Sequence, residues 1–185
     1  MNKNAAFTAP LQRPKETGVE ENWAFLVLPK SASECLPRRG RITVDGTLNG
    51  AAFREMLEPD GQLSHWLKVS VPLREAAGVS FGDLVKVEIV PLQEEPDPAV
   101  PEDFGKALEA NPEAHLGWNS TTTLARLDWI HWMTSAKQKK TRAKRVAEGC
   151  DKLASGKRRV CCFDPSGFYS KAFTSPQPAD SKPID

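Results

Sequence analysis

The sequence predicts an α+β protein in which a small β-barrel over residues 6–92 is followed by a three-helix module over residues 101–159. Two observations lead to this prediction. Apolar and polar residues mostly alternate as far as Leu92, as they do in strands with one buried face. Beyond Pro101 the apolar residues recur every three or four positions, as they do along the buried face of a helix.

The first strands of the barrel are marked by a proline and by a turn. Trp23–Leu28 is apolar throughout and stops at Pro29, which predicts a strand buried on both faces. Ile42–Leu48 alternates and is followed by Asn49-Gly50, a dipeptide that accepts the positive φ angles of a tight hairpin turn. A returning strand through residues 53–57 completes the predicted hairpin.

The rest of the barrel is predicted as a strand, a short helix and a last strand. His65–Val71 alternates and ends at Pro72, and Leu73–Gly78 suits one or two helical turns with a glycine stop. Leu84–Ile89 follows as the last strand. Several short strands at close spacing, with one short helix among them, are typical of a small barrel.

Three helices are predicted beyond the barrel. The first covers residues 101–110, and its opening carboxylates suit the positive end of the helix dipole. The second, residues 121–136, is apolar on nearly all sides, so we expect it at the centre of the bundle with Trp129 and Trp132 pointing inward. The third covers residues 141–154.

Two further segments show neither the alternation of apolar residues typical of strands nor the repeat typical of helices. Residues 93–100 are acidic and rich in proline, which blocks both helix and sheet, so an extended linker is predicted there. Residues 160–185 are rich in Pro, Ser, Asp and Lys and are predicted to form a flexible tail. Nothing in the sequence assigns a role to Cys161 and Cys162 within that tail.

Positive charge is concentrated in residues 135–149. The basic residues share one side of the predicted helix, opposite its apolar side, which favours an ordinary solvated face. A face that binds phosphate or lipid headgroups is an alternative, because the positive run continues through residues 157–159. In a third interpretation the acidic segment 94–103 folds back onto this face. Stacking aromatic residues are missing from the basic side, so binding of single-stranded nucleic acid is not favoured.

The sequence contains no motif of a known catalytic site. Its histidines are isolated, its cysteines lack metal-ligand spacing, and no phosphate-binding glycine loop occurs, so no catalytic residue, metal or cofactor is predicted. Ligand-binding candidates are four polar residues on or near barrel strands, which most often simply face solvent in such positions. These candidates are Arg54, His65, Lys68 and Arg74.

The composition points to a cytoplasmic protein. The N-terminal residues lack the apolar stretch of a secretory signal, and no apolar run approaches the ~20 residues that cross a bilayer. The four cysteines show no disulfide framework, so we expect reduced thiols. The net charge of +1 gives no global field that would attract polyanions.

Short motifs along both halves resemble a known family pair. The helical half resembles the bacterial YdeI/OmpD-associated family of bacteriocin-protection proteins. The barrel half resembles the small domain of unknown function that often precedes it. Together they cover about residues 7–159, and the tail matches nothing. The motifs of the helical half are Pro101–Asp103, Ala107-Leu108, Trp129-Ile130, Ala136-Lys137, Thr141-Arg142, Arg145-Val146 and Leu153–Arg158; those of the barrel are Trp23–Phe25, Gly46–Gly50, Phe53, His65, Arg74, Ala76–Gly78 and Gly82–Val85.

The resemblance implies an N-terminal double-split β-barrel of the AbrB-like kind, and a role in tolerance of antimicrobial peptides or envelope stress. It implies no reaction and no catalytic residues. Its pattern selects Lys137, Arg142 and Arg145 as the anion-binding candidates of the basic helix, and Gly117–Asn119 departs from the plain loop expected there.

We therefore expect a non-enzymatic cytoplasmic binding protein whose partner is an unknown protein or small molecule. Two alternatives stay open. One is a nucleic-acid-binding module that uses the basic helix, and the other is an unrecognised enzyme or small-ligand binder at the barrel–helix cleft, with His65 and Arg74.

Overall fold

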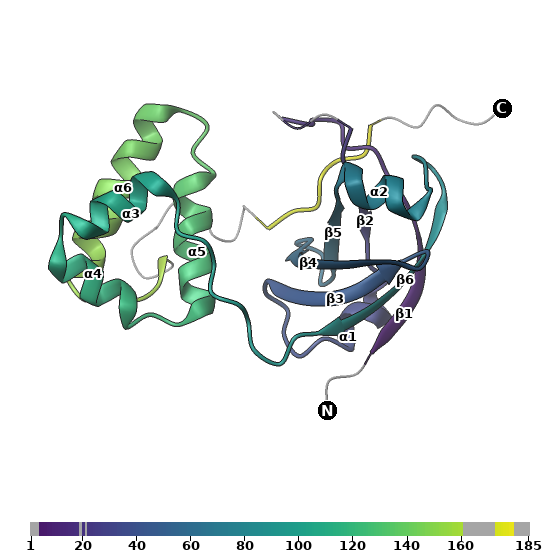
Figure 1. Ribbon diagram of the computed structural model, residues 1–185, viewed down its shortest axis with the longest axis horizontal. Helices are drawn as coiled ribbons and strands as arrows, with labels where there is room; N and C mark the ends of the chain where they lie inside the picture. Colours follow the sequence, from purple (N-terminus) through teal and green to yellow (C-terminus); the bar gives the residue numbers. More distant parts are fainter. Residues whose placement is uncertain (1–3, 19, 21, 161–172, 180–185) are drawn as a thin grey trace. The chain divides into compact units, whose positions relative to one another are not determined.

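The chain folds into two compact units, each with its own hydrophobic core (Figure 1). The computed structural model describes residues 4–18, 20, 22–160 and 173–179. The barrel unit runs to Glu94 and also includes the described segment 173–179, whereas the helical unit begins at Glu95. The predicted α+β class, with a barrel before helices, is confirmed.

Six strands form one antiparallel sheet that curls into a nearly closed barrel. Gln12, which follows the first strand, and Phe25 of the second strand exchange backbone hydrogen bonds of 2.8 and 2.9 Å, so the two edges of the sheet are joined there. This pairing covers edges that would otherwise expose unpaired backbone groups. In sheet order the strands are β1 (Ala5–Pro10), β6 (Leu84–Pro91), β3 (Ile42–Leu48), β4 (Ala51–Pro59), β5 (His65–Val69) and β2 (Ala24–Val27).

The predicted hairpin and the doubly buried strand are both confirmed. Asn49 and Gly50 connect β3 to β4 with φ angles of 46° and 88°, the positive values that the dipeptide suggested. In β2 the side chain of Leu26 lies in the barrel core, and Phe25 is fully buried as well. Phe25 packs with Trp23 and Trp66, whose ring centroids each lie 6.4 Å from its own.

Two short helices accompany the barrel. The helix α2 (Val71–Ala77) was predicted; Ser70 caps its start, and Gly78 ends it in the left-handed conformation at φ 64°. The helix α1 (Lys30–Glu34) was not predicted, because a helix of only five residues after Pro29 is too short to show the helical repeat of apolar residues.

The described part of the helical unit, up to Val160, contains four helices, one more than the sequence predicted. The additional helix, α4, begins at Asn111-Pro112, which looked only like the end of the preceding helix. The Asn111 side chain accepts a hydrogen bond of 3.0 Å from the Ala114 amide, and Pro112 occupies the first turn. The four helices are α3 (Glu102–Glu109), α4 (Pro112–Asn119), α5 (Thr123–Thr134) and α6 (Lys139–Ala154).

The helix α6, and not α5, lies at the centre of this bundle, because α6 packs against α3, α4 and α5. The inward direction of Trp129 and Trp132 on α5 is confirmed by exposed fractions of 0% and 6%. Leu124 on the same helix is 36% exposed, so the apolar circumference of α5 is only partly covered.

The C-terminal segment 173–179, yellow in Figure 1, is held against the barrel and differs from the predicted flexible tail. Lys15 donates a backbone hydrogen bond to Gln177, and Ala179 donates one to Arg13, both 2.8 Å long. The Arg41 guanidinium lies 5.0 Å from the centre of the Phe173 ring. The other residues of the predicted tail, including Cys161 and Cys162, lie outside the described residues.

Candidate functional site

The structure does not bring the four predicted ligand-binding residues together. Along β5 the side chains alternate, so His65 is buried whereas Lys68 faces outward and pairs with Glu20. Arg54 forms a two-pronged ion pair, 2.6 and 2.8 Å long, with Asp45 of the neighbouring strand. Both of these exposed charges therefore have acid partners on the barrel surface.

His65 is fixed inside the barrel unit by both ring nitrogens. Its Nδ1 lies 2.6 Å from the Ser33 hydroxyl, and its Nε2 lies 3.0 Å from the Gly40 carbonyl oxygen. The carbonyl can only accept, so Nε2 carries the proton and Nδ1 accepts from Ser33. Burial lowers the pKa of His65 below its ordinary value of 6.5. The ring thus acts as a neutral connection between α1, β5 and the chain at Gly40.

This lowered pKa predicts a loss of stability in acid. The folded ring stays neutral below pH 6.5, whereas the unfolded chain takes up a proton there, so stability falls as pH drops through that window. Urea unfolding measured at about pH 7.5 and about pH 5.5 should show this decline. It should be smaller in His65→Gln, whose amide can make both hydrogen bonds, and unchanged in the exposed His115→Gln. An undiminished decline in His65→Gln would contradict the assignment.

The arginines of the basic helix are used in contacts within the helical unit. Arg142 donates two hydrogen bonds, 2.6 and 2.9 Å long, to Asp103, and this bonding lowers the pKa of Asp103. Arg145 donates a hydrogen bond of 2.6 Å to the Trp132 carbonyl oxygen. Lys137 is exposed. The acidic segment does fold back at Asp103, as one interpretation suggested.

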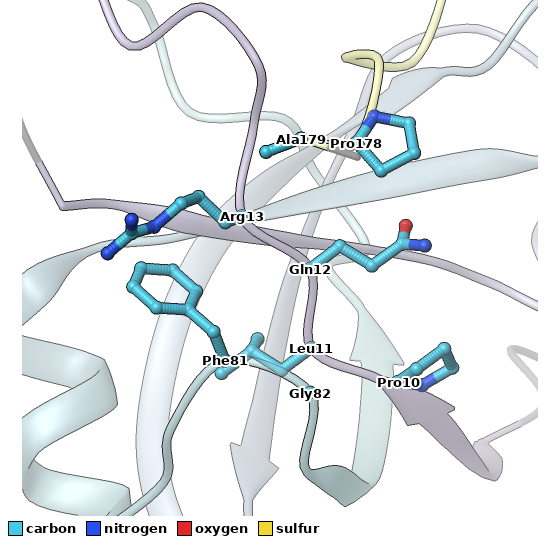
Figure 2. A pocket seen from close by; sticks show the side chains of 8 residues that line it. All are labelled: Pro10, Leu11, Gln12, Arg13, Phe81, Gly82, Pro178 and Ala179. Atoms are coloured by element: carbon cyan, nitrogen blue, oxygen red, sulfur yellow. The ribbon is translucent and has the colours of Figure 1, made fainter. Parts of the chain in front are cut away.

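A groove of about 600 Å³ opens on the barrel unit (Figure 2). Phe81 and the side chain of Arg13 lie together on one side of it, and Gln12 points to the opposite side. Backbone groups that line the groove already form hydrogen bonds with each other. The Gly82 amide donates a hydrogen bond of 2.7 Å to the Leu11 carbonyl oxygen, and the Ala179 amide donates one to the Arg13 carbonyl oxygen. The lining residues are Pro10, Leu11, Gln12, Arg13, Phe81, Gly82, Pro178 and Ala179.

Two guanidinium groups lie against the Phe81 ring, although only Arg13 of the two arginines lines the groove. The guanidinium carbons of Arg13 and Arg74 each lie 4.4 Å from the ring centroid, a cation–π distance. Among the described residues neither arginine forms an ion pair or a side-chain hydrogen bond. The sequence selected Arg74 but missed Arg13 and Phe81, because they lie 68 positions apart and only the fold brings them together.

Another side chain that could be chemically reactive lies in packed surroundings. Cys150 is buried, and burial raises the pKa of its thiol, which opposes the reactive thiolate form. Within the described ranges, no three His, Cys, Asp or Glu residues gather where they could hold a metal ion. Of the helices in those same ranges, none combines the length and the hydropathy that a bilayer crossing requires.

Comparison with known families confirms the resemblance seen in the sequence. A model described as "Domain of unknown function (DUF1905)" matches residues 7–89, which form the barrel. A model described as "Bacteriocin-protection, YdeI or OmpD-Associated" matches residues 97–156, which form the helices. No curated protein matches the chain. The protein therefore joins a DUF1905 barrel to a helical domain of the bacteriocin-protection, YdeI or OmpD-associated family.

Proposed function

We propose that this chain is a non-enzymatic, cytoplasmic binding protein that supports protection against bacteriocins and related antimicrobial peptides. The observation that carries the protective role is the family match over residues 97–156, which spans α3 to α6. A role in binding is supported by the geometry of the barrel unit. Its groove is lined by Arg13 and Phe81, and Arg13 forms no ion pair with an acid among the described residues.

The surroundings of the best catalytic candidate also favour binding over catalysis. A general base needs a nitrogen that can reach a substrate proton. Both nitrogens of His65 lie within hydrogen-bond distance of protein atoms, and its side chain is 1% exposed. In the basic helix, Arg142 and Arg145 are occupied by partners inside the helical unit, which leaves exposed lysines as its accessible charges.

Deletion of the gene tests the protective role. We expect the deleted strain to stop growing at a severalfold lower concentration of a cationic bacteriocin such as nisin, and the full chain supplied in trans should restore growth. Cell fractionation should recover the protein with cytoplasmic markers. A deletion strain as resistant as its parent would contradict the proposal, as would recovery of the chain in an extracytoplasmic fraction.

A further inference from the structure

We propose that a groove between α3 and α6 binds a medium-chain fatty acid, with its carboxylate beside Lys139 and its alkyl chain along α6. The groove has a volume of about 390 Å³, which falls within the range of small-molecule sites. It lies wholly in the helical unit, where α3 packs against α6 (Figure 1). This assignment does not depend on the protective role proposed above.

Most of the residues that line the groove are apolar and small. Ala107 stands on α3, and Ala143, Val146 and Ala147 stand on α6. The three residues of α6 share one side of the helix, because positions three or four apart lie one above the other. Ala143 and Ala147 are exposed, so an alkyl chain that covered them would remove apolar surface from water.

The other lining residues carry charge and leave the groove with one positive charge. Arg142 donates two hydrogen bonds to Asp103, so these two charges neutralise each other. Lys139 is exposed and forms no ion pair among the described residues. The neighbouring acid of α3, Glu102, is already paired with Lys106 at 2.6 Å. A single carboxylate from solution would therefore match the charge that remains at Lys139.

The place of Lys139 on α6 sets the direction of the ligand. Lys139 is the first residue of the helix, and Ala143 and Ala147 follow it after about one and two turns. The first turn contains no acid, and Gln138 makes no capping hydrogen bond through its side chain, so the positive end of the helix dipole reinforces the lysine. From Lys139 to Ala147 the helix rises about 12 Å, which is close to the length of an extended chain of about ten carbons.

The same distribution of charge argues against two other ligand classes. A cationic peptide would be repelled by Lys139. A phosphate monoester carries close to two negative charges near neutral pH, and the groove has no second unpaired cation among its described lining residues. Glu148, which follows Ala147 along α6, lies 3.7 Å from Lys144 and so does not compete for Lys139. An apolar chain that ends in one negative charge agrees best with these contacts.

Calorimetric titration of the full chain with sodium decanoate, kept below its micelle concentration, tests the assignment. We expect saturable binding with a negative heat-capacity change, the marker of apolar surface that is buried on binding. Octanoate should bind about fourfold to tenfold more weakly, because its shorter chain buries fewer methylene groups. The matched ligand controls are acetate, which lacks the chain, and decyltrimethylammonium, which reverses the charge, and neither should show saturable binding.

Three variants locate the site. Lys139→Glu should weaken decanoate binding about tenfold or more, because repulsion replaces attraction. An acid in the first turn favours a helix, so this variant should melt no lower than the unmodified protein in circular dichroism. Ala143→Glu should weaken binding about as much, because it places a carboxylate on the apolar wall. Lys157→Glu makes the same change of charge beyond the end of α6 and outside the groove, so its affinity should be unchanged.

Binding of decanoate that is weakened in Lys139→Glu and Ala143→Glu, and kept in Lys157→Glu, supports the proposal. The proposal would be overturned if decanoate did not bind, if decyltrimethylammonium bound equally well, or if Lys139→Glu kept full affinity. Cosedimentation with vesicles of phosphatidylcholine and phosphatidylglycerol examines the other anionic occupant. Association with these vesicles without binding of decanoate would identify a bilayer surface as the partner of Lys139 and would also overturn the proposal.

Discussion

Replacement of Trp129 by alanine is expected to destabilise the helical unit by about 3–5 kcal/mol. The side chain is completely buried, and its ring meets that of Trp132 edge to face at 6.2 Å between centroids. Its Nε1 also donates a hydrogen bond of 3.3 Å to the Arg158 carbonyl oxygen. Alanine would leave a large cavity beside the central helix α6, and the small bundle has few side chains that can fill it.

Urea unfolding followed by circular dichroism at a helical wavelength measures this loss. Leu116→Ala provides the control, because Leu116 is 72% exposed on α4 and its truncation should change stability by less than about 0.5 kcal/mol. A loss below about 1 kcal/mol for Trp129→Ala would mean that this tryptophan does not anchor the core.

Substitution of Gly117 by alanine is expected to lower the free energy of unfolding of the helical unit by about 3 kcal/mol, the second large effect. A Cβ atom at this position would stand 2.9 Å from the Leu153 carbonyl carbon and still closer to its oxygen. Those atoms belong to the backbone of α6 and cannot rotate away as a side chain can. The helices α4 and α6 would have to separate, although alanine itself favours a helix by about 1 kcal/mol over glycine.

Two other helical glycines supply matched controls for the same substitution. At Gly105 the new Cβ would meet only Val100, at an ordinary 3.8 Å, so Gly105→Ala should stabilise α3 by about 0.5–1 kcal/mol. At Gly149 it would meet the flexible Met133 methyl at 2.6 Å, and we expect a net change within about 1 kcal/mol. If Gly117→Ala proved as mild as these two, the close approach of α4 to α6 would be refuted.

The same glycines explain why the sequence misplaced the centre of the bundle. Hydrophobic periodicity selected α5, since its large side chains cover most of its circumference. A central helix, however, needs neighbours that can approach closely, and glycines at the contacts allow this without adding to a hydrophobic pattern. Gly117 and Gly149 both lie at contacts of this kind in the helical unit.

The barrel was easier to predict because its signals are local. Asn49-Gly50 specifies a hairpin turn, and Gly78 specifies a helix end, without reference to the rest of the chain. The groove is a tertiary feature, since its lining residues Arg13, Phe81 and Pro178 come from separate segments. An arginine in a sequence does not reveal whether an acid will face it, so the sequence selected Arg54, which pairs with Asp45, and missed Arg13, which lines the groove.

The return of residues 173–179 to the barrel has a consequence for biosynthesis. Translation proceeds from the N-terminus, so the ribosome releases all six strands and all four helices of the helical unit before Pro178 emerges. A nascent chain can therefore form the sheet early, but one wall of the groove is added only when this late segment docks. The complete groove therefore forms only after the polypeptide has been synthesised at least as far as Ala179.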